Sequence, residues 1–168
     1  MPHSPDGPLL DAMLDSWDRN NTILVNLLLA LPEDTMMLRA MDGSPTFAQL
    51  FAHMHYVRLV FIAEDAPEFA RALPEQEWSD AHEQGRLAEM LRDSAAAVRD
   101  EVRHRISLGM AMEQHYDHPL LLLQHMLWHE GYHYGQIKLA LKLAGRPMAN
   151  ADAGPISWRV WMNKITTG

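Results

Sequence analysis

The sequence contains no cysteine, and this absence removes several kinds of chemistry at once. Disulfide bonds, thiolate metal ligands and a cysteine nucleophile are all excluded. A chain without disulfides suits a reducing compartment, so we expect a cytoplasmic location. Residues 1–6 lack the basic stretch and apolar run of a signal peptide, which agrees with that expectation.

An excess of positive charge and a long apolar run are also missing. The chain has 22 acidic and 14 basic residues, for a net charge of −8. Nucleic-acid-binding proteins usually carry a basic stripe, so we expect no nucleic-acid partner. The most apolar run, residues 24–31, is far shorter than the roughly 20 residues that span a bilayer, so we expect no membrane partner.

The remaining composition is that of an ordinary globular protein. Of the 168 residues, 48% are hydrophobic and 21% are charged, which argues against disorder. This length suits one domain over residues 1–168 with a sizeable buried core. The sequence shows neither internal repeats nor the alternating pattern of strands, so we predict an all-α fold.

Four amphipathic stretches, separated by proline-containing breaks, account for most of the chain. In the first, apolar residues recur every three or four positions, as Leu10, Leu14 and Trp17 show, and this is the period of a helix. A short helical turn is expected around Phe69. Four long helices in one small domain predict a four-helix bundle with a short C-terminal aromatic tail. The predicted helices span residues 8–31, 46–65, 80–108 and 119–145.

Local signals mark where three of these helices begin. Thr46 and Gln49 have the spacing of a capping box, which predicts a helix start at Thr46. Asp80 and Glu83 have the same spacing and predict the start of the third helix. Pro119 suits the first turn of the fourth helix, where a missing N–H costs nothing.

His129 and His133 are the most informative residues of the chain. They lie one helical turn apart, where Cβ atoms are about 5–6 Å from each other, so both imidazoles can reach one divalent ion. Lys138 and Lys142 fall on the far side of the helix, which turns the histidines toward the interior. Buried imidazole nitrogens need partners. A metal ion could be that partner; the alternative is hydrogen bonding to side chains, carbonyl groups or water.

A third histidine adds to this pair. His53 shares a helix face with Leu50 and Val57, whereas His55 lies about 200° away beside Arg58. We therefore expect His53 to point into the core and His55 to point away from it. One histidine from the second helix and two from the fourth would supply three nitrogen ligands. That set leaves an open position, as catalytic metal sites do.

The other histidines receive weaker assignments. His125 lies one turn before His129 and could complete the coordination, orient a ligand or line a substrate pocket; we favour the last two. The remaining five are expected to be solvated: His3, His82, His104, His115 and His118.

Residues 129–133 also spell the H-E-x-x-H pattern of zinc proteases. Those enzymes need a third ligand further along the chain. Residues 134–168 contain no histidine, and Asp152 is their only acidic residue. Gly131 inside the motif also weakens its helix by about 1 kcal/mol relative to alanine. A zinc protease is therefore not expected.

Three residues near the histidines are candidates for catalysis or binding. Glu130 lies about 100° from His129, where it could be a general base or a surface or interhelical carboxylate. Tyr56 and Tyr132 could line a substrate pocket and donate hydrogen bonds. Packing in the core is the alternative use of such aromatic residues.

Two segments resemble the DinB-like (YfiT-like) metalloprotein superfamily. Phe47-Ala48-Gln49-Leu50-Phe51-Ala52-His53 is similar to its T/A-x-x-L-L-x-H segment. His129-Glu130-x-Tyr132-His133-x-Gly135-Gln136-Ile137 resembles its H-x-x-x-H-x-G-Q-I signature. The likeness covers nearly the whole chain. It implies an up-down-down-up four-helix bundle, often dimeric, in which His53, His129 and His133 bind one nickel or zinc ion.

The resemblance implies an activity as well. Some members transfer small thiols such as bacillithiol or mycothiol, and others isomerise or hydrolyse small molecules. We therefore expect a metal-dependent transferase or hydrolase acting on small molecules, with a low-molecular-weight thiol as one candidate substrate. The alternative is a non-catalytic metal-binding bundle of the stress-response kind. A homodimer is expected too, because Phe51, Leu59 and Ile62 make the second helix apolar on more than one side.

Overall fold

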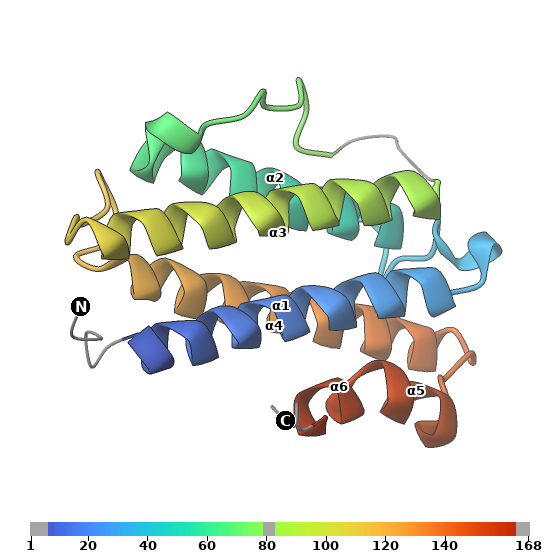
Figure 1. Ribbon diagram of the computed structural model, residues 1–168. Coiled ribbons are helices and arrows are strands. Elements are labelled where there is room, and N and C mark those ends of the chain that lie inside the picture. Colours follow the sequence, from blue (N-terminus) through green and yellow to red (C-terminus); the bar gives the residue numbers. More distant parts are fainter. Residues whose placement is uncertain (1–6, 79–82, 164–168) are drawn as a thin grey trace.

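The computed structural model describes residues 7–78 and 83–163, and these residues are helical throughout apart from connecting turns and one isolated bridge between Arg39 and Thr46. The predicted all-α class is thus confirmed. None of the described helices is long and apolar enough to cross a membrane. Four long helices lie side by side (Figure 1): α1 (Gly7–Ala30), α2 (Phe47–Asp65), α3 (Gln84–Ser107) and α4 (Pro119–Leu143).

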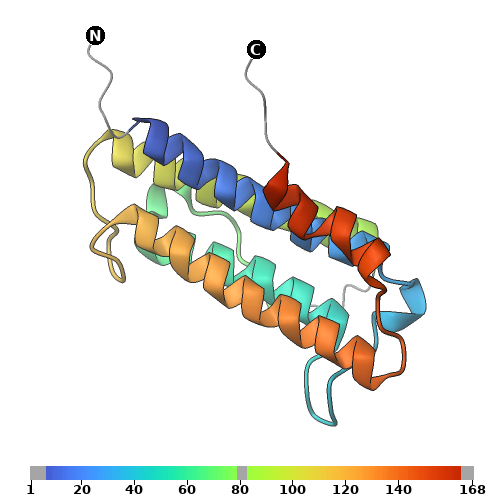
Figure 2. The same cartoon turned by 90° about the horizontal axis from the view of Figure 1, so that it is seen from below.

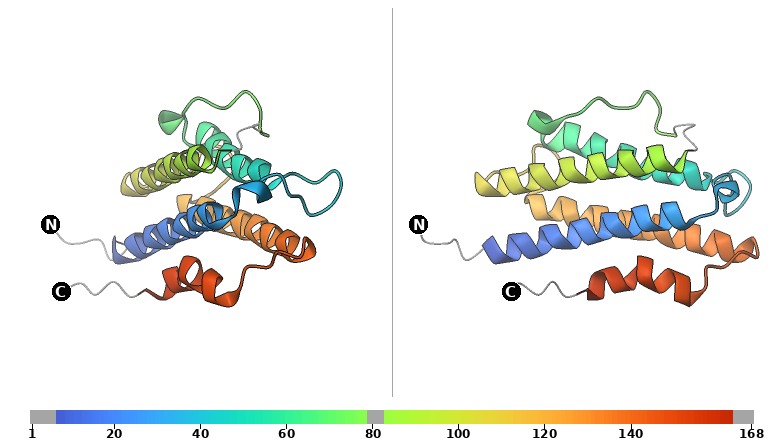
Figure 3. Two further views of the ribbon diagram at one scale, coloured as in Figure 1. Left: turned by 90° about the vertical axis from the view of Figure 1, so that its right-hand side faces the viewer. Right: turned by 45° about the vertical axis from the view of Figure 1, so that its right-hand side comes forward.

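Four shorter elements complete the described fold. They are the 3₁₀ turns η1 (Glu33–Thr35) and η2 (Pro67–Phe69), and the helices α5 (Asn150–Ile156) and α6 (Trp158–Met162). The turn expected around Phe69 is η2. Both α5 and α6 contact α1, and Figures 2 and 3 show them running alongside it on the outside of the bundle.

The predicted helix starts are confirmed at two positions and wrong at the third. At Thr46 the hydroxyl accepts from the Gln49 N–H at 3.2 Å, and the Gln49 side chain accepts from the Thr46 N–H at 2.9 Å. Helix α4 begins at Pro119 as predicted. Helix α3 begins only at Gln84, so Glu83 is its N-cap residue and not part of its first turn. Asp80 lies outside the described residues.

Helix α4 ends in a backbone turn at Gly145. Gly145 has a φ of +70°, the left-handed conformation that suits glycine. This turn lets the Arg146 N–H donate to the Leu141 carbonyl at 2.8 Å and the Gly145 N–H donate to the Lys142 carbonyl at 3.1 Å. Two carbonyl groups at the helix end are satisfied in this way.

The interior consists of two apolar clusters with a polar layer between them. One cluster uses later residues of α1 and α4 and early residues of α2 and α3, including Leu28, Phe51 and Leu91. The other uses the opposite helix ends, including Trp17 and Ile62. The polar layer takes one hydrogen-bonded side chain from each long helix, at a position between the two clusters in sequence: Asn20, Arg58, Ser94 and Glu130. Polar side chains at this depth require internal partners.

Helix α2 is buried on most of its circumference, and this corrects two expectations. His55, expected to point away from the core, is only 8% exposed. Its Nδ1 contacts the Met90 carbonyl of α3 at 2.8 Å. The expectation of a dimer rested on three apolar residues that are buried within this chain: Phe51, Leu59 and Ile62. Because α2 packs against both α3 and α4, its side opposite His53 is also interior.

Candidate metal centre

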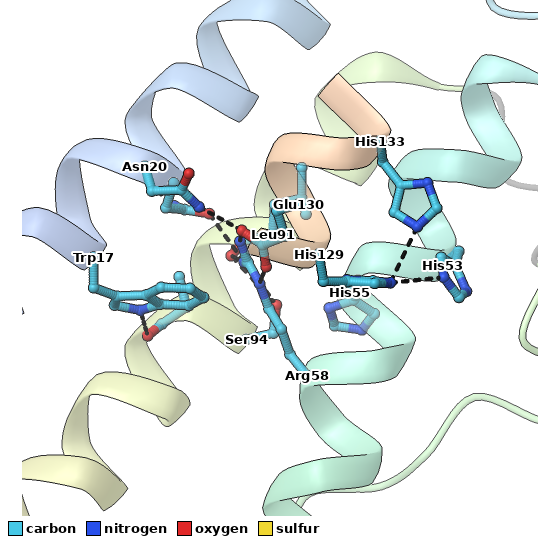
Figure 4. Close-up of polar contacts among 12 residues, drawn as sticks. Trp17, Asn20, His53, His55, Arg58, Leu91, Ser94, His129, Glu130 and His133 are labelled. Atoms are coloured by element: carbon cyan, nitrogen blue, oxygen red, sulfur yellow. Dashed lines mark hydrogen bonds and ion pairs between the residues drawn. The ribbon is translucent and has the colours of Figure 1, made fainter. Parts of the chain in front are cut away.

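The three histidines selected from the sequence come together between α2 and α4. The His129 Nε2 atom lies 3.1 Å from His53 Nε2 and 3.0 Å from His133 Nε2 (Figure 4). The candidate ligand atoms of the three side chains all lie within 4.8 Å of one another, so the group could hold a metal ion. Nitrogens bound to a common ion at about 2.0–2.1 Å would be about 3.3 Å apart at tetrahedral angles. The observed spacing is close to that value.

Hydrogen bonds at the far side of two rings determine which nitrogen carries the proton. His53 Nδ1 lies 2.6 Å from Glu77 Oε1, and His133 Nδ1 lies 2.7 Å from Gln136 Oε1. Because these oxygens only accept, each Nδ1 must donate and each Nε2 keeps a free lone pair. His129 Nδ1 is buried and has no hydrogen-bond partner among the described residues. The Nε2 lone pairs of His53 and His133 thus face His129 Nε2, which lies within hydrogen-bond distance of both.

The surroundings also keep two of the imidazoles, those of His129 and His133, neutral. Burial, followed by the neighbouring His133 and His53, lowers the pKa of His129 to about 3. Burial lowers the pKa of His133 as well, with His53 adding to the effect and the Gln136 hydrogen bond opposing it. A histidine must be deprotonated to bind a metal, so protons compete weakly with a cation here.

His125 lies beside this group without joining it. Its ring centroid is 6.4 Å from that of His129, and its Nδ1 is 2.6 Å from the Tyr116 hydroxyl. Burial raises the pKa of Tyr116 to about 12, with Asp65 and Glu101 adding to the effect, so this hydroxyl is a proton donor at neutral pH. The geometry therefore gives His125 a neighbouring position and not that of a fourth ligand.

The two candidate tyrosines differ in their surroundings. Tyr132 is 57% exposed, its ring centroid is 5.2 Å from that of His133, and its hydroxyl accepts from the Gln136 side chain at 2.9 Å. The Tyr132 hydroxyl proton is therefore free to donate to a ligand. Tyr56 is half-buried on α2, three residues after His53.

Glu130 lies in the polar layer and is completely buried. Its carboxylate accepts from Arg58 Nε at 2.6 Å and Arg58 Nη2 at 3.0 Å, and Asn20 Nδ2 donates to it at 2.5 Å. Figure 4 shows this side chain turned away from His53 toward Arg58 and Asn20. The geometry fits the interhelical carboxylate, which was one of the two alternatives for this residue.

Several residues around the histidines were not found from the sequence. Glu77 contacts His53, and the Trp78 ring stacks on the His53 ring with a centroid distance of 4.9 Å and an interplanar angle of 17°. Both residues precede α3 in a connection without a periodic pattern. Arg58, the partner of Glu130, was recognised only as a neighbour of His55 on its helix face. No local sequence signal indicates these contacts.

Two of the histidines expected to be solvated have structural contacts. The His115 Nδ1 lies 2.8 Å from the buried carboxylate of Asp65. His118 is the N-cap residue of α4, and its ring nitrogen accepts from the Leu120 N–H at 3.2 Å. Their positions in loops were correct, but each one satisfies a polar group of the fold. His3 and His82 lie outside the described residues.

The fold and the site together define a helical protein with a partly buried group of three histidines that could hold a metal. The model of the DinB family matches residues 1–159, and the chain therefore belongs to the DinB family. A search of curated proteins and a search of solved structures found no significant match.

Proposed function

We propose that His53, His129 and His133 bind one divalent ion, nickel or zinc, and that the centre serves a metal-dependent enzyme acting on small molecules. The observation that carries this proposal is the convergence of three histidine Nε2 atoms in a partly buried site. Membership of the DinB family, together with the resemblance to its metal-binding signature, supports the same proposal. The reaction class we favour is thiol transfer or hydrolysis.

The arrangement around the site suits such chemistry. Three protein ligands leave a position for an exchangeable molecule. A bound divalent ion would make a water or small thiol more acidic and so supply its anion as a nucleophile. The exposed Tyr132 hydroxyl, next to His133, could donate a hydrogen bond to a substrate. The alternative is a non-catalytic metal-binding bundle of the stress-response kind, which needs no exchangeable position.

Cobalt(II) tests both parts of the proposal. Metal-free protein should bind one cobalt ion per chain, and azide or a small thiol should then change the visible spectrum because a ligand position is open. Alanine at His53, His129 or His133 should reduce the bound cobalt sharply, since two imidazoles hold an ion more weakly than three. Bound metal is measured by elemental analysis after gel filtration.

Two variants provide controls for this experiment. His104→Ala changes an exposed histidine of α3 and should leave cobalt binding unchanged. His55→Ala should also retain cobalt, but it should unfold more easily because the buried hydrogen bond from His55 Nδ1 to the Met90 carbonyl is lost. A triple alanine variant that binds cobalt as well as the parent would refute the ligand set. A spectrum unmoved by saturating azide would favour the non-catalytic alternative.

We also infer the up-down-down-up helix order that the family resemblance implies. In Figure 1 the connection after η2 runs back along the bundle before α3 begins, which supports parallel α2 and α3. Such a crossover distinguishes this order from a bundle joined by short loops alone.

We propose in addition that the protein is a homodimer joined through α4. The supporting surface is the α4 stripe, a row of exposed apolar side chains on one side of the helix. Helix α4 has no exposed acidic residue, because its only one, Glu130, is buried. In a chain with a net charge of −8, such a surface lets two copies approach with little repulsion. The stripe consists of Leu121, Trp128, Tyr132, Leu139 and Leu143, each at least 49% exposed.

Sedimentation velocity tests the dimer. The parent should sediment near twice 19.1 kDa at micromolar concentration. Leu139→Glu should shift the equilibrium to monomer, because a dimer would bury the new charge without a partner. Leu9→Glu places the same charge on α1, at a residue that is 60% exposed, and should leave the dimer intact. A parent that stays monomeric across the concentration range would contradict the proposal.

A further inference from the structure

The connection between α2 and α3 places two side chains against one metal-ligand candidate. Glu77 Oε1 lies 2.6 Å from His53 Nδ1, on the ring edge opposite the nitrogen that faces the other histidines. Trp78 stacks on the same ring, nearly parallel to it. Neither side chain is buried deeply, since that of Glu77 is 39% exposed and Trp78 is 37% exposed.

His53 needs such support more than the other two histidines. His129 and His133 stand one turn apart on α4, so their helix sets their spacing. The Nδ1 of His133 is also held by Gln136, three residues further along the same helix. His53 comes alone from α2, and its described side-chain partners on the Nδ1 edge and on the ring face come from outside that helix.

The chemistry of the contact suits a role in metal binding. A carboxylate that accepts from Nδ1–H holds the proton on that nitrogen and leaves Nε2 free to bind an ion. It also fixes the ring orientation and makes the imidazole a stronger donor, an effect typically worth 10–100-fold in metal affinity when the partner is lost. The stacked indole of Trp78 further restricts rotation of the ring.

We propose that Glu77 is a positioning residue of the metal centre, acting through His53, and that Trp78 assists it by holding the plane of the ring. The segment between α2 and α3 is then part of the site, although it supplies no ligand. This inference rests on the proposed function, because it presupposes that His53 binds an ion.

The test compares zinc affinity in the parent and in Glu77 variants, starting from metal-free protein and using competition with a chromogenic chelator. Glu77→Ala should weaken zinc binding about 10–100-fold. Glu77→Gln keeps an oxygen that can accept from Nδ1–H but loses the charge, so its affinity should fall between those of the parent and Glu77→Ala. Glu75→Ala is the matched control, because it removes the same charge from an exposed residue of the same segment.

A second measurement separates positioning from a general structural role. The melting temperature of metal-free Glu77→Ala should equal that of metal-free Glu75→Ala, whereas the zinc-bound forms should differ. A Glu77→Ala variant that binds zinc as tightly as Glu75→Ala would overturn the inference, and so would one whose metal-free form melts well below the control. If the parent itself bound no zinc, nickel or cobalt, the proposed function would fail first, which distinguishes the two outcomes.

Discussion

Replacing Arg58 with methionine should lower the free energy of unfolding by about 3–5 kcal/mol, because it leaves the carboxylate of Glu130 buried without its partner charge. Both side chains of this pair are fully buried. The two hydrogen bonds between them, at 2.6 and 3.0 Å, use both carboxylate oxygens. Asn20 would remain as a partner of Glu130, but an amide does not neutralise the charge.

Arg58 also makes contacts with neighbouring groups that a methionine side chain, which has no hydrogen-bond donor, cannot make. Its Nη1 donates to the Leu91 carbonyl at 2.7 Å and to the Asn21 side chain at 3.0 Å, and its guanidinium lies 4.8 Å from the centre of the Trp17 ring. These contacts tie α2 to α1 and α3, while Glu130 ties it to α4. Methionine preserves much of the side-chain volume, so the loss reflects unpaired polar groups more than a cavity.

Urea denaturation followed by circular dichroism measures this effect. Arg146→Met is the matched control, because Arg146 pairs with Asp34 at the surface, and exposed pairs contribute only about 0–1 kcal/mol. The double variant Arg58→Met/Glu130→Leu should recover part of the loss, since it removes the unpaired charge. Equal losses in Arg58→Met and Arg146→Met would contradict a stabilising role for the buried pair.

The contribution of Glu101 to the stability of the protein should fall as pH rises from 4.5 toward about 9. This residue of α3 is fully buried, and neither of its carboxylate oxygens has a hydrogen-bond partner among the described residues. Burial, with the charge of Asp65 adding to it and Arg105 opposing it, raises the pKa of Glu101 from 4.5 to about 9. Near neutral pH its carboxyl group is therefore protonated in the folded protein.

The direction of the effect follows from proton uptake. Between the unfolded pKa of 4.5 and the folded pKa of about 9, the folded state holds a proton that the unfolded state has released. The contribution of Glu101 is therefore fully present below pH 4.5 and declines as pH rises through this window. The decline should reach about 1.4 kcal/mol per pH unit for one proton.

Glu101→Gln should remove this dependence, because a neutral amide of similar shape has no proton to lose. We expect the variant to exceed the parent in stability at the alkaline end of the window. Glu89→Gln, an exposed change on the same helix, should keep the pH dependence of the parent. The measurement is the free energy of unfolding in urea at several values between about pH 6 and pH 8.5. A parent and a Glu101→Gln variant with the same slope would refute this account.

Periodic patterns identified the features that depend on a single helix. His129 and His133 were recognised because residues four apart share a face whatever the helix packs against. His53 was selected because its face is apolar. The same reasoning placed His55 correctly on the opposite face, but it treated that face as exposed. Helix α2 contacts both α3 and α4, so both faces are interior, and only packing could reveal this.

The sequence by itself determined the helical class, the approximate helix ranges and the three histidines that converge, because these follow from local periodicity and end signals. Only the tertiary structure decided how the polar groups of different helices pair. Arg58 and Glu130 form a pair although they are 72 positions apart in the sequence. Glu77 contacts His53 from 24 positions further along the chain, and the connection that contains Glu77 has no periodic pattern. Among the described residues Glu101 has no hydrogen-bond partner, for the same reason: whether a buried carboxyl finds a donor depends on what other helices bring to it.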